Sequence, residues 1–240
     1  MKKRIFYLTF LIFFAVRVQA EDGYRLWLRY DPISDKTVFN SYRNTIKQLV
    51  FPAKSATLLA ARTEISNGIK GLLQIQLPEK ENELANGTLL IGTPASSKLI
   101  NFLPVKTALQ GLGNEGYLIQ TITTNQKKIT VIAANTDVGV LYGVFNFLKL
   151  LQTHQNINAL NLKDFPRIKL RLLNHWDNLD GSVERGYAGK SLWDWATLPQ
   201  KITPRYVDYA RANASLGING TVLTNVNANA LILTQKYLVK

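Results

Sequence analysis

An aromatic and polar segment in the last third of the chain, residues 172–195, reads LLNHWDNLDGSVERGYAGKSLWDW. It contains three tryptophans and four carboxylates, and it follows an apolar run at 168–173 that predicts a β-strand. A second polar segment, 225–229, follows a strand-like run at 220–224. Between the two strands, residues 204–216 are predicted to form a helix with a proline at its first position. This order predicts that both polar segments follow the carboxyl ends of strands, where (β/α)8 barrels build their active sites.

The composition of the 240-residue chain excludes several kinds of site. Hydrophobic residues make up 46% of it, which is enough for a packed core. The chain has no cysteine, so disulfides, thiolate metal sites and a cysteine nucleophile are excluded. It has two histidines, His154 and His175, which are too few for a multi-histidine metal site. We therefore expect neither a metal ion nor another cofactor.

The first twenty residues have the pattern of a secretory signal peptide. Lys2, Lys3 and Arg4 form a positive start, an apolar run covers 5–16, and small residues end at Ala20. A membrane anchor is the alternative, but the apolar run is shorter than the roughly 20 residues that span a bilayer. We therefore predict cleavage after residue 20 and a secreted or periplasmic protein.

The chain is basic, with a formal net charge of +13 that falls to +9 without the predicted signal peptide. The basic residues are scattered, and neither a basic stripe nor a nucleic-acid module is present. We therefore expect no nucleic-acid partner and, after signal cleavage, no membrane partner. A solvated basic surface and an anionic polymer as ligand both remain compatible with the charge.

Residues 21–166 alternate predicted strands and helices, which indicates an N-terminal α/β domain that ends near Pro166. Asn125 and Gln126 are predicted to form a hairpin turn. Gly139 and Gly143 are four residues apart on one predicted helix and would allow a neighbouring element to approach closely. The predicted strands are 24–30, 87–92, 117–123 and 128–134, and the predicted helices are 41–51, 55–73, 96–102 (capped by Ser96) and 137–151.

In the segment 172–195, Trp176 and His175 are candidates for substrate binding. The flat face of Trp176 could stack on the C–H face of a sugar ring, whereas most tryptophans pack in a core. His175 could act as a general base, or it could donate a structural hydrogen bond. Polar neighbours on both sides of Trp176 favour the surface position.

The same segment supplies carboxylates, and a glycosidase needs two of them across one glycosidic bond. The alternative is that they form ion pairs with nearby basic residues, which we favour. In the second polar segment, asparagine side chains could bind sugar hydroxyls or cap turns. The carboxylates are Asp177, Asp180, Glu184 and Asp194, their expected partners are Arg171, Arg185 and Lys190, and the asparagines are Asn225, Asn227 and Asn229.

Four stretches of the chain closely resemble the α-glucuronidases of glycoside hydrolase family 67. They are NHWDNLDGSVERGYAGKSLW (174–193), YARANASLGINGTVLTNVNAN (209–229), GYLI (116–119) and GVLYGVFNFLKLLQT (139–153). The resemblance implies an N-terminal α/β domain of the hexosaminidase-associated type, residues 21–166, followed by the start of a (β/α)8 barrel at 167–240. It also implies removal, with inversion, of α-1,2-linked glucuronic acid or its 4-O-methyl ether from xylooligosaccharides during xylan degradation.

The resemblance also implies site residues. Trp176 matches a tryptophan that borders the uronic acid, and Val226 matches a valine at the rim of that pocket. Asn225, His175 and Asp177 are neighbouring candidates for substrate binding. The expected ligands are glucuronoxylan-derived oligosaccharides, and a homodimer is an expectation for the full-length enzyme.

The family's catalytic acid and base lie in barrel strands that would follow Lys240, so the resemblance implies an N-terminal fragment without catalytic residues. We predict that this fragment alone is inactive. Two other classes of protein remain open. One is a non-catalytic carbohydrate-binding module that uses the tryptophan-rich segment, and the other is a hexosaminidase relative with the same domain order.

Overall fold

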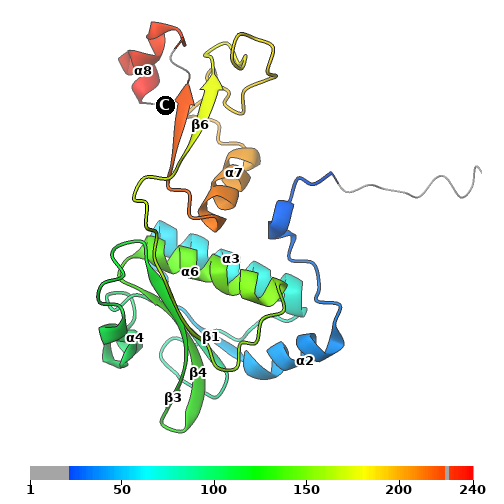
Figure 1. Ribbon diagram of the computed structural model, residues 1–240, viewed down its shortest axis with the longest axis vertical. Coiled ribbons are helices and arrows are strands. Elements are labelled where there is room, and N and C mark those ends of the chain that lie inside the picture. The colour runs from blue at the N-terminus through cyan, green and yellow to red at the C-terminus, as the bar shows by residue number, and fades with distance from the viewer. Residues whose placement is uncertain (1–21, 225–226, 240) are drawn as a thin grey trace, which may run out of the picture.

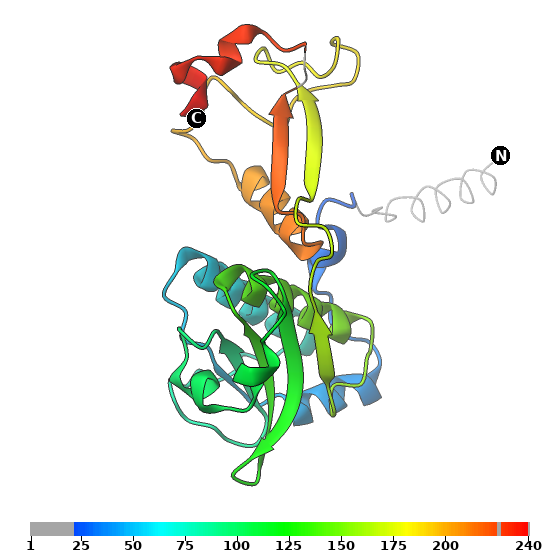
Figure 2. The same cartoon turned by 60° about the vertical axis from the view of Figure 1, so that its left-hand side comes forward.

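The computed structural model describes residues 22–224 and 227–239. The predicted signal segment lies outside these residues, and so do Asn225 and Val226. The described residues form a larger N-terminal unit, 22–164, and a smaller C-terminal unit, 172–239, which lie one above the other (Figures 1 and 2). Over this part of the chain, no helix has the length and apolar character needed to cross a membrane.

A mixed five-stranded sheet forms the centre of the N-terminal unit. Its first three strands are parallel to one another, and β3 runs antiparallel to both of its neighbours. The strands in spatial order are β1 (Gln48–Val50), β2 (Thr88–Gly92), β4 (Lys127–Ala134), β3 (Tyr117–Thr124) and β5 (Asn161–Asp164). Asn125 and Gln126 join β3 to β4 with φ angles of 47° and 61°, so the predicted hairpin turn is confirmed.

Helices cover both faces of this sheet, because the strands are apolar on both. The helices α3 (Ala56–Leu73) and α6 (Asp137–Gln152) pack side by side on one face, and α4 (Lys98–Phe102) and α5 (Val105–Ala108) cover the other (Figure 1). Because side chains point alternately to the two faces of the sheet, β2 contributes to two apolar clusters, one under each pair of helices. Leu89 and Ile91 face α3 and α6, whereas Leu90 joins the cluster under α4 and α5.

Gly139 and Gly143 bring α6 close to the sheet, as the sequence predicts. A Cβ atom on Gly143 would lie 2.8 Å from Cγ2 of Ile132 in β4. A Cβ atom on Gly139 would lie 2.6 Å from the carbonyl oxygen of Gly116 and 2.7 Å from Cβ of Ala134. Real Cβ atoms do not approach a backbone oxygen so closely, so the helix requires glycine at this position.

We expect Gly139→Ala to lower the free energy of unfolding by about 1–2 kcal/mol. Overpacking costs about 1–3 kcal/mol, and the upper part of this range, about 2–3 kcal/mol, applies here because the nearest atom belongs to the backbone and cannot rotate aside. The higher helix propensity of alanine offsets about 1 kcal/mol of that cost. Ser66→Ala, on the exposed face of α3, is the control and should change stability by less than about 0.5 kcal/mol. Urea unfolding measures both, and equal stabilities of the two variants would contradict the close approach.

The prediction of a strand at 24–30 is wrong. This segment forms a short 3-10 helix, η1 (Leu26–Arg29), and Leu26 and Tyr30 adopt positive φ angles of 52° and 54°. The alternating large residues of this segment are held by tertiary contacts, and no neighbouring strand pairs with them in the described part of the chain. Leu28 and Tyr30 are buried, and the indole Nε1 of Trp27 donates to Ser215 Oγ at 2.8 Å.

The predicted helix at 41–51 begins and ends too late. The observed helix, α2 (Lys36–Thr45), begins after Asp35, whose carboxylate accepts from the backbone N–H groups of Thr37 and Val38. Residues 48–50 form the buried strand β1, which periodicity alone cannot distinguish from a buried helical turn. The cap of α4 is Ser97 rather than Ser96, because Ser97 Oγ accepts from the N–H of Ile100.

The C-terminal unit contains a two-stranded parallel sheet and one long helix. The strands are β6 (Leu172–Asp177) and β7 (Gly220–Thr224), and α7 (Pro204–Ser215) connects them and lies against α6 (Figure 1). The short helices η2 (Ala230–Leu233) and α8 (Gln235–Leu238) follow. The predictions of α7, with proline at its first position, and of β7 are confirmed.

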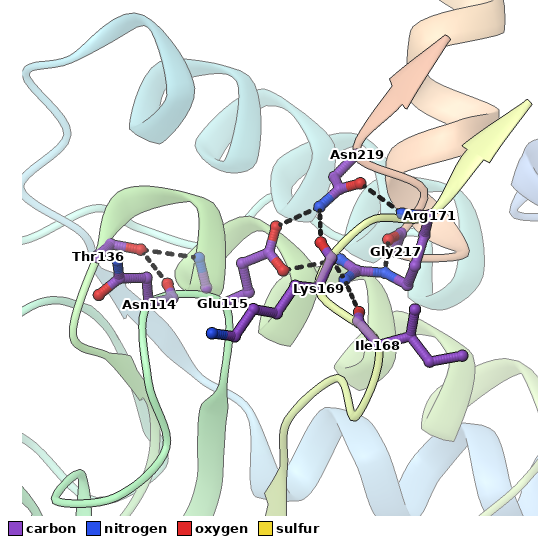
Figure 3. Close-up of polar contacts among 9 residues, drawn as sticks. Asn114, Glu115, Thr136, Ile168, Lys169, Arg171, Gly217 and Asn219 are labelled. Carbon is purple, nitrogen blue, oxygen red and sulfur yellow. Dashed lines mark hydrogen bonds and ion pairs between the residues drawn. The ribbon is translucent and has the colours of Figure 1, made fainter. Parts of the chain in front are cut away.

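The predicted strand at 168–173 is wrong by four residues, because Arg171 holds the chain in a bend. The guanidinium of Arg171 donates to the carbonyl oxygens of Ile168 and Gly217 and pairs with Glu115 at 2.9 Å (Figure 3). Asn219 donates to Glu115 and accepts from the N–H of Arg171. These contacts tie the start of both C-terminal strands to the N-terminal unit.

A buried ion pair forms a second tie between the units. Glu64 of α3 is only 4% exposed, and both of its oxygens accept from Arg211 of α7 at 2.8 Å. The hydroxyl of Tyr30 donates to the same carboxylate. Burial, together with the Glu64 charge, raises the pKa of Tyr30, and the hydrogen bonds that Arg211 donates to Glu64 raise the pKa of Arg211.

Candidate functional site

The candidate site lies at the carboxyl ends of β6 and β7. The strands are parallel neighbours, so the polar segments that follow them begin at the same edge. The regular pairing Asn174–Val222 is followed by the pairing Asp177–Thr224, and the irregularity between them places a bulge at His175 and Trp176. Bulges often redirect side chains next to functional sites. His175, Trp176 and Asp177 therefore belong to the end of the strand itself, and the prediction that they follow it is wrong.

A chain of polar groups fixes the imidazole of His175. Its Nε2 lies 2.6 Å from the hydroxyl of Tyr209, which lies 3.2 Å from Oγ1 of Thr221. Its Nδ1 lies 3.8 Å from Oδ1 of Asp177. Because both nitrogens face polar partners within the protein, His175 is held in one orientation, which fits the structural alternative better than a free general base.

Two aromatic rings, those of Trp193 and Tyr209, contact this imidazole, and a third, that of Tyr206, packs against Trp193. The ring of Trp193 meets His175 edge-on at 5.7 Å and Tyr209 at 5.4 Å, and it lies 5.2 Å from the ring of Tyr206. The Nε1 donor of Trp193 is buried and finds no acceptor in the part of the chain that the structure describes. This aromatic cluster was not predicted from the sequence. The sequence feature that could have indicated it is the spacing of Tyr206 and Tyr209, which are three residues apart and therefore lie on one face of α7.

Asp177 anchors the loop 178–203. Its side chain is 3% exposed, and it accepts a hydrogen bond from Ser191 Oγ. Ser191 Oγ in turn accepts from the N–H of Trp193 at 2.9 Å, and the N–H of Ser191 donates to Gly181. The buried carboxylate thus connects the end of β6 to the segment that carries the aromatic cluster.

The predicted ion pairs of the loop carboxylates are replaced by local hydrogen bonds. Asp180 accepts from the side chain and N–H of Ser182, and these bonds lower the pKa of Asp180. Asp194 accepts chiefly from Thr197, which lowers the pKa of Asp194. Arg171 pairs with Glu115 instead. Asp180 and Asp194 therefore stabilise turns.

Trp176, which lies between His175 and Asp177 in β6, is largely exposed. It is 48% exposed, which is incompatible with a core position, and its carbonyl oxygen accepts from the N–H of Glu184. Asn225 and Val226 lie outside the described residues, and Asn227 is exposed. Among the described residues, no three His, Cys, Asp or Glu side chains are grouped as metal ligands. What the structure brings together at this edge is an exposed tryptophan beside an oriented histidine.

Comparison with known families covers both units of the chain. Residues 26–147 match the N-terminus of glycosyl hydrolase family 67, and residues 150–240 match the middle domain of the same family. The chain belongs to glycoside hydrolase family 67. The resemblance found in the sequence motifs is thereby confirmed.

Curated proteins similar to this chain include two fungal proteins. A probable α-glucuronidase A of Aspergillus oryzae is 30% identical over 232 residues, which cover 96% of this chain and 27% of the relative. The α-glucuronidase A of Emericella nidulans is 29% identical over 238 residues, which cover 92% of this chain and 26% of the relative. The chain thus spans about a quarter of the length of these relatives.

A solved structure of another glycosidase family shows the same fold. A GH115 4-O-methyl-α-glucuronidase with specificity for decorated arabinogalactans matches 80% of this family 67 chain and 28% of its own chain, with a TM-score of 0.51 and 15% identity. The mixed α/β fold predicted from the sequence is confirmed for the described residues.

We expect Asp177→Ala to loosen the loop 178–203 of this family 67 chain. The variant removes the acceptor of the Ser191 hydroxyl and so loosens the segment around it. The Ser191 N–H, which donates to the carbonyl oxygen of Gly181, should then exchange with solvent faster, and the unfolding free energy should fall by about 1–3 kcal/mol. Asp180→Ala, which affects only the local turn with Ser182, is the control. Hydrogen exchange of Ser191 that stays equal in both variants would show that Asp177 is not the anchor.

Proposed function

We propose that this chain is the N-terminal part of an α-glucuronidase that hydrolyses α-1,2-linked glucuronic acid, or its 4-O-methyl ether, from xylooligosaccharides with inversion. Membership of family 67 and the names of the curated relatives support the glucuronidase activity. The observation that carries the assignment of the site is the exposed Trp176 at the carboxyl end of β6, where barrel enzymes bind their substrates.

We also propose that β6, α7 and β7 are the first elements of a (β/α)8 barrel. Leu172, Leu173, Val222 and Leu223 of the two strands are each more than a third exposed. Apolar strand residues of this kind are normally covered, and further barrel strands and helices would cover them. The greater length of the relatives is consistent with such a continuation.

Within this proposal, Trp176 stacks on the uronic acid and Val226, with Asn225, borders the pocket. His175 and Asp177 hold the neighbouring residues in place and do not react with the substrate, because both side chains are hydrogen-bonded within the protein. The catalytic acid and base would come from barrel strands that follow residue 240. A signal peptide at 1–20 would direct the enzyme to a secreted or periplasmic location, where it meets oligosaccharides from glucuronoxylan.

The test compares residues 21–240 with a full-length protein that continues through the barrel. Both are incubated with aldouronic acids, and the released glucuronic acid and its initial anomer are followed by NMR. We expect turnover with inversion in the full-length protein and none in the fragment. Turnover by the fragment at a comparable rate would contradict the proposal. Sugar binding without turnover in both proteins would instead support a non-catalytic carbohydrate-binding module.

A further inference from the structure

A groove of about 320 Å³ lies at the opposite end of the C-terminal unit from the candidate site. It is bordered by η1, the segment 30–34 and the C-terminal ends of α3 and α6. Trp27, on one wall, is bonded to Ser215 at the end of α7, just before the chain enters β7. The candidate site is at the other end of β7, so the two locations are separate.

Trp27 presents a fixed aromatic surface to this groove. It is 44% exposed, and its indole N–H donates to Ser215 Oγ at 2.8 Å, which fixes the plane of the ring. A ring that is already oriented loses little conformational freedom when a ligand stacks on it. An exposed tryptophan with its polar end satisfied therefore offers an apolar platform at the edge of a polar groove.

The remaining walls supply both donors and acceptors. Asp31 lies 3.3 Å from Nε of Arg29, and Gln152 and His154 contribute an amide and an imidazole. A sugar hydroxyl donates and accepts at once, so a mixed set of this kind suits a polyol better than a purely ionic ligand. Opposite charges adjoin each other here, which disfavours a highly charged ligand.

His154 adopts a backbone conformation that is uncommon for a residue with a side chain. Its φ angle is 55°, and it directly follows the C-terminal cap of α6, Thr153, at a position where glycine is usual. Its backbone N–H donates to the carbonyl oxygen of Leu151, so His154 caps the end of the helix with its backbone and not with its side chain. Such outliers concentrate at functional sites, and here the imidazole borders the groove.

We propose that this groove is a second carbohydrate-binding site, which takes a pyranose ring of a xylose chain. Xylopyranose lacks an exocyclic hydroxymethyl group, so its C–H face is flat and can lie on Trp27, while its hydroxyls reach Asp31, Gln152 and His154. The site would hold an oligosaccharide at a distance from the catalytic edge. The proposal depends on the proposed function only for the choice of xylose as the sugar.

The test uses the full-length enzyme and titrates xylohexaose by calorimetry, with glucuronic acid added at saturation to occupy the catalytic pocket. We expect Trp27→Ala to weaken binding about five- to tenfold through the loss of the stacked ring. His154→Gly should weaken it about threefold while the melting temperature is unchanged or higher, because glycine suits a positive φ. An aldouronic acid and cellohexaose, titrated in parallel, show whether the site prefers substituted xylose or glucose chains.

Two matched controls separate binding from general effects. Phe102→Ala removes an aromatic ring that is 83% exposed on α4, away from the groove, and Gln126→Gly places glycine at another positive φ of 61°. Neither should change the affinity for xylohexaose. If Trp27→Ala does not fold, His154→Gly decides the question alone.

Equal affinity in the wild type, Trp27→Ala and His154→Gly would overturn the proposal, and so would the absence of xylohexaose binding or a stronger preference for cellohexaose. Failure of the proposed function gives a different result. In that case aldouronic acids would not be hydrolysed, whereas binding of xylohexaose that depends on Trp27 would persist and the second site would stand.

Discussion

Replacing Glu64 by glutamine is expected to lower the free energy of unfolding by about 2–4 kcal/mol. The carboxylate is buried and accepts from Arg211 through both oxygens and from Tyr30. Glutamine has the same size but only one acceptor oxygen, so its NH₂ group would face the donors of the guanidinium. Breaking a buried pair by changing one partner costs about 3–5 kcal/mol. We place the expected value lower because a third of the Arg211 side chain reaches solvent.

The location of the effect is as informative as its size. Arg211 lies on α7 and Glu64 on α3, so Glu64→Gln should increase hydrogen exchange in α7 more than in the central strands β2 and β4. Glu79→Gln is the matched control, because Glu79 pairs with Arg62 on the surface and such pairs contribute about 0–1 kcal/mol.

Urea unfolding and hydrogen exchange together test this tie between the units. A loss below about 1 kcal/mol for Glu64→Gln, similar to that of Glu79→Gln, would show that the buried pair does not hold α7 in place. The double variant Glu64→Leu with Arg211→Met should be more stable than Glu64→Leu alone, because it leaves no buried charge without a partner.

Helices with strong local signals were predictable from the sequence. The helix α3 has an apolar face and begins after Ser55, whose hydroxyl accepts from the N–H of Leu58. The helix α6 begins after Thr136, whose hydroxyl accepts from Gly139, and α7 begins with proline. In each case the capping residue and the periodicity lie within the segment itself, so no distant contact is needed to recognise the helix.

Segments whose structure depends on distant residues were not predictable. Residues 24–30 alternate like a strand, but Trp27 is held by Ser215 and Tyr30 by Glu64. Residues 168–171 are apolar enough for a strand, but Arg171 bends the chain through contacts with Glu115 and Gly217. These partners lie between 34 and 188 residues away, and a local pattern contains no information about them.

In the candidate site too, features that depend on neighbouring residues in the sequence were predictable, and features that depend on distant residues were not. The sequence placed His175, Trp176 and Asp177 together because they are adjacent in the chain. It did not show that Asp177 is buried as the anchor of a loop, or that Trp193 and Tyr209 contact His175, because those contacts join β6 to the loop 178–203 and to α7.

In the full-length enzyme, Trp176→Ala is expected to lower kcat/KM for aldouronic acids about ten- to a hundredfold. The side chain of Trp176 is half-exposed at the carboxyl end of β6. Loss of a stacked aromatic contact should remove about 1–3 kcal/mol of transition-state binding. Stability should change far less than for a core tryptophan, whose truncation costs about 3–5 kcal/mol.

Two variants from the same loop calibrate this result. Trp195 is buried, so Trp195→Ala should lower the melting temperature strongly, and Tyr187 is 75% exposed in the loop, so Tyr187→Ala should change neither quantity. If Trp176→Ala behaves like Trp195→Ala, with kcat/KM per folded molecule unchanged, Trp176 is a packing residue and the substrate site lies elsewhere. If it keeps the wild-type melting temperature and loses activity, the exposed indole contacts the substrate, because its only large loss is then in the transition state.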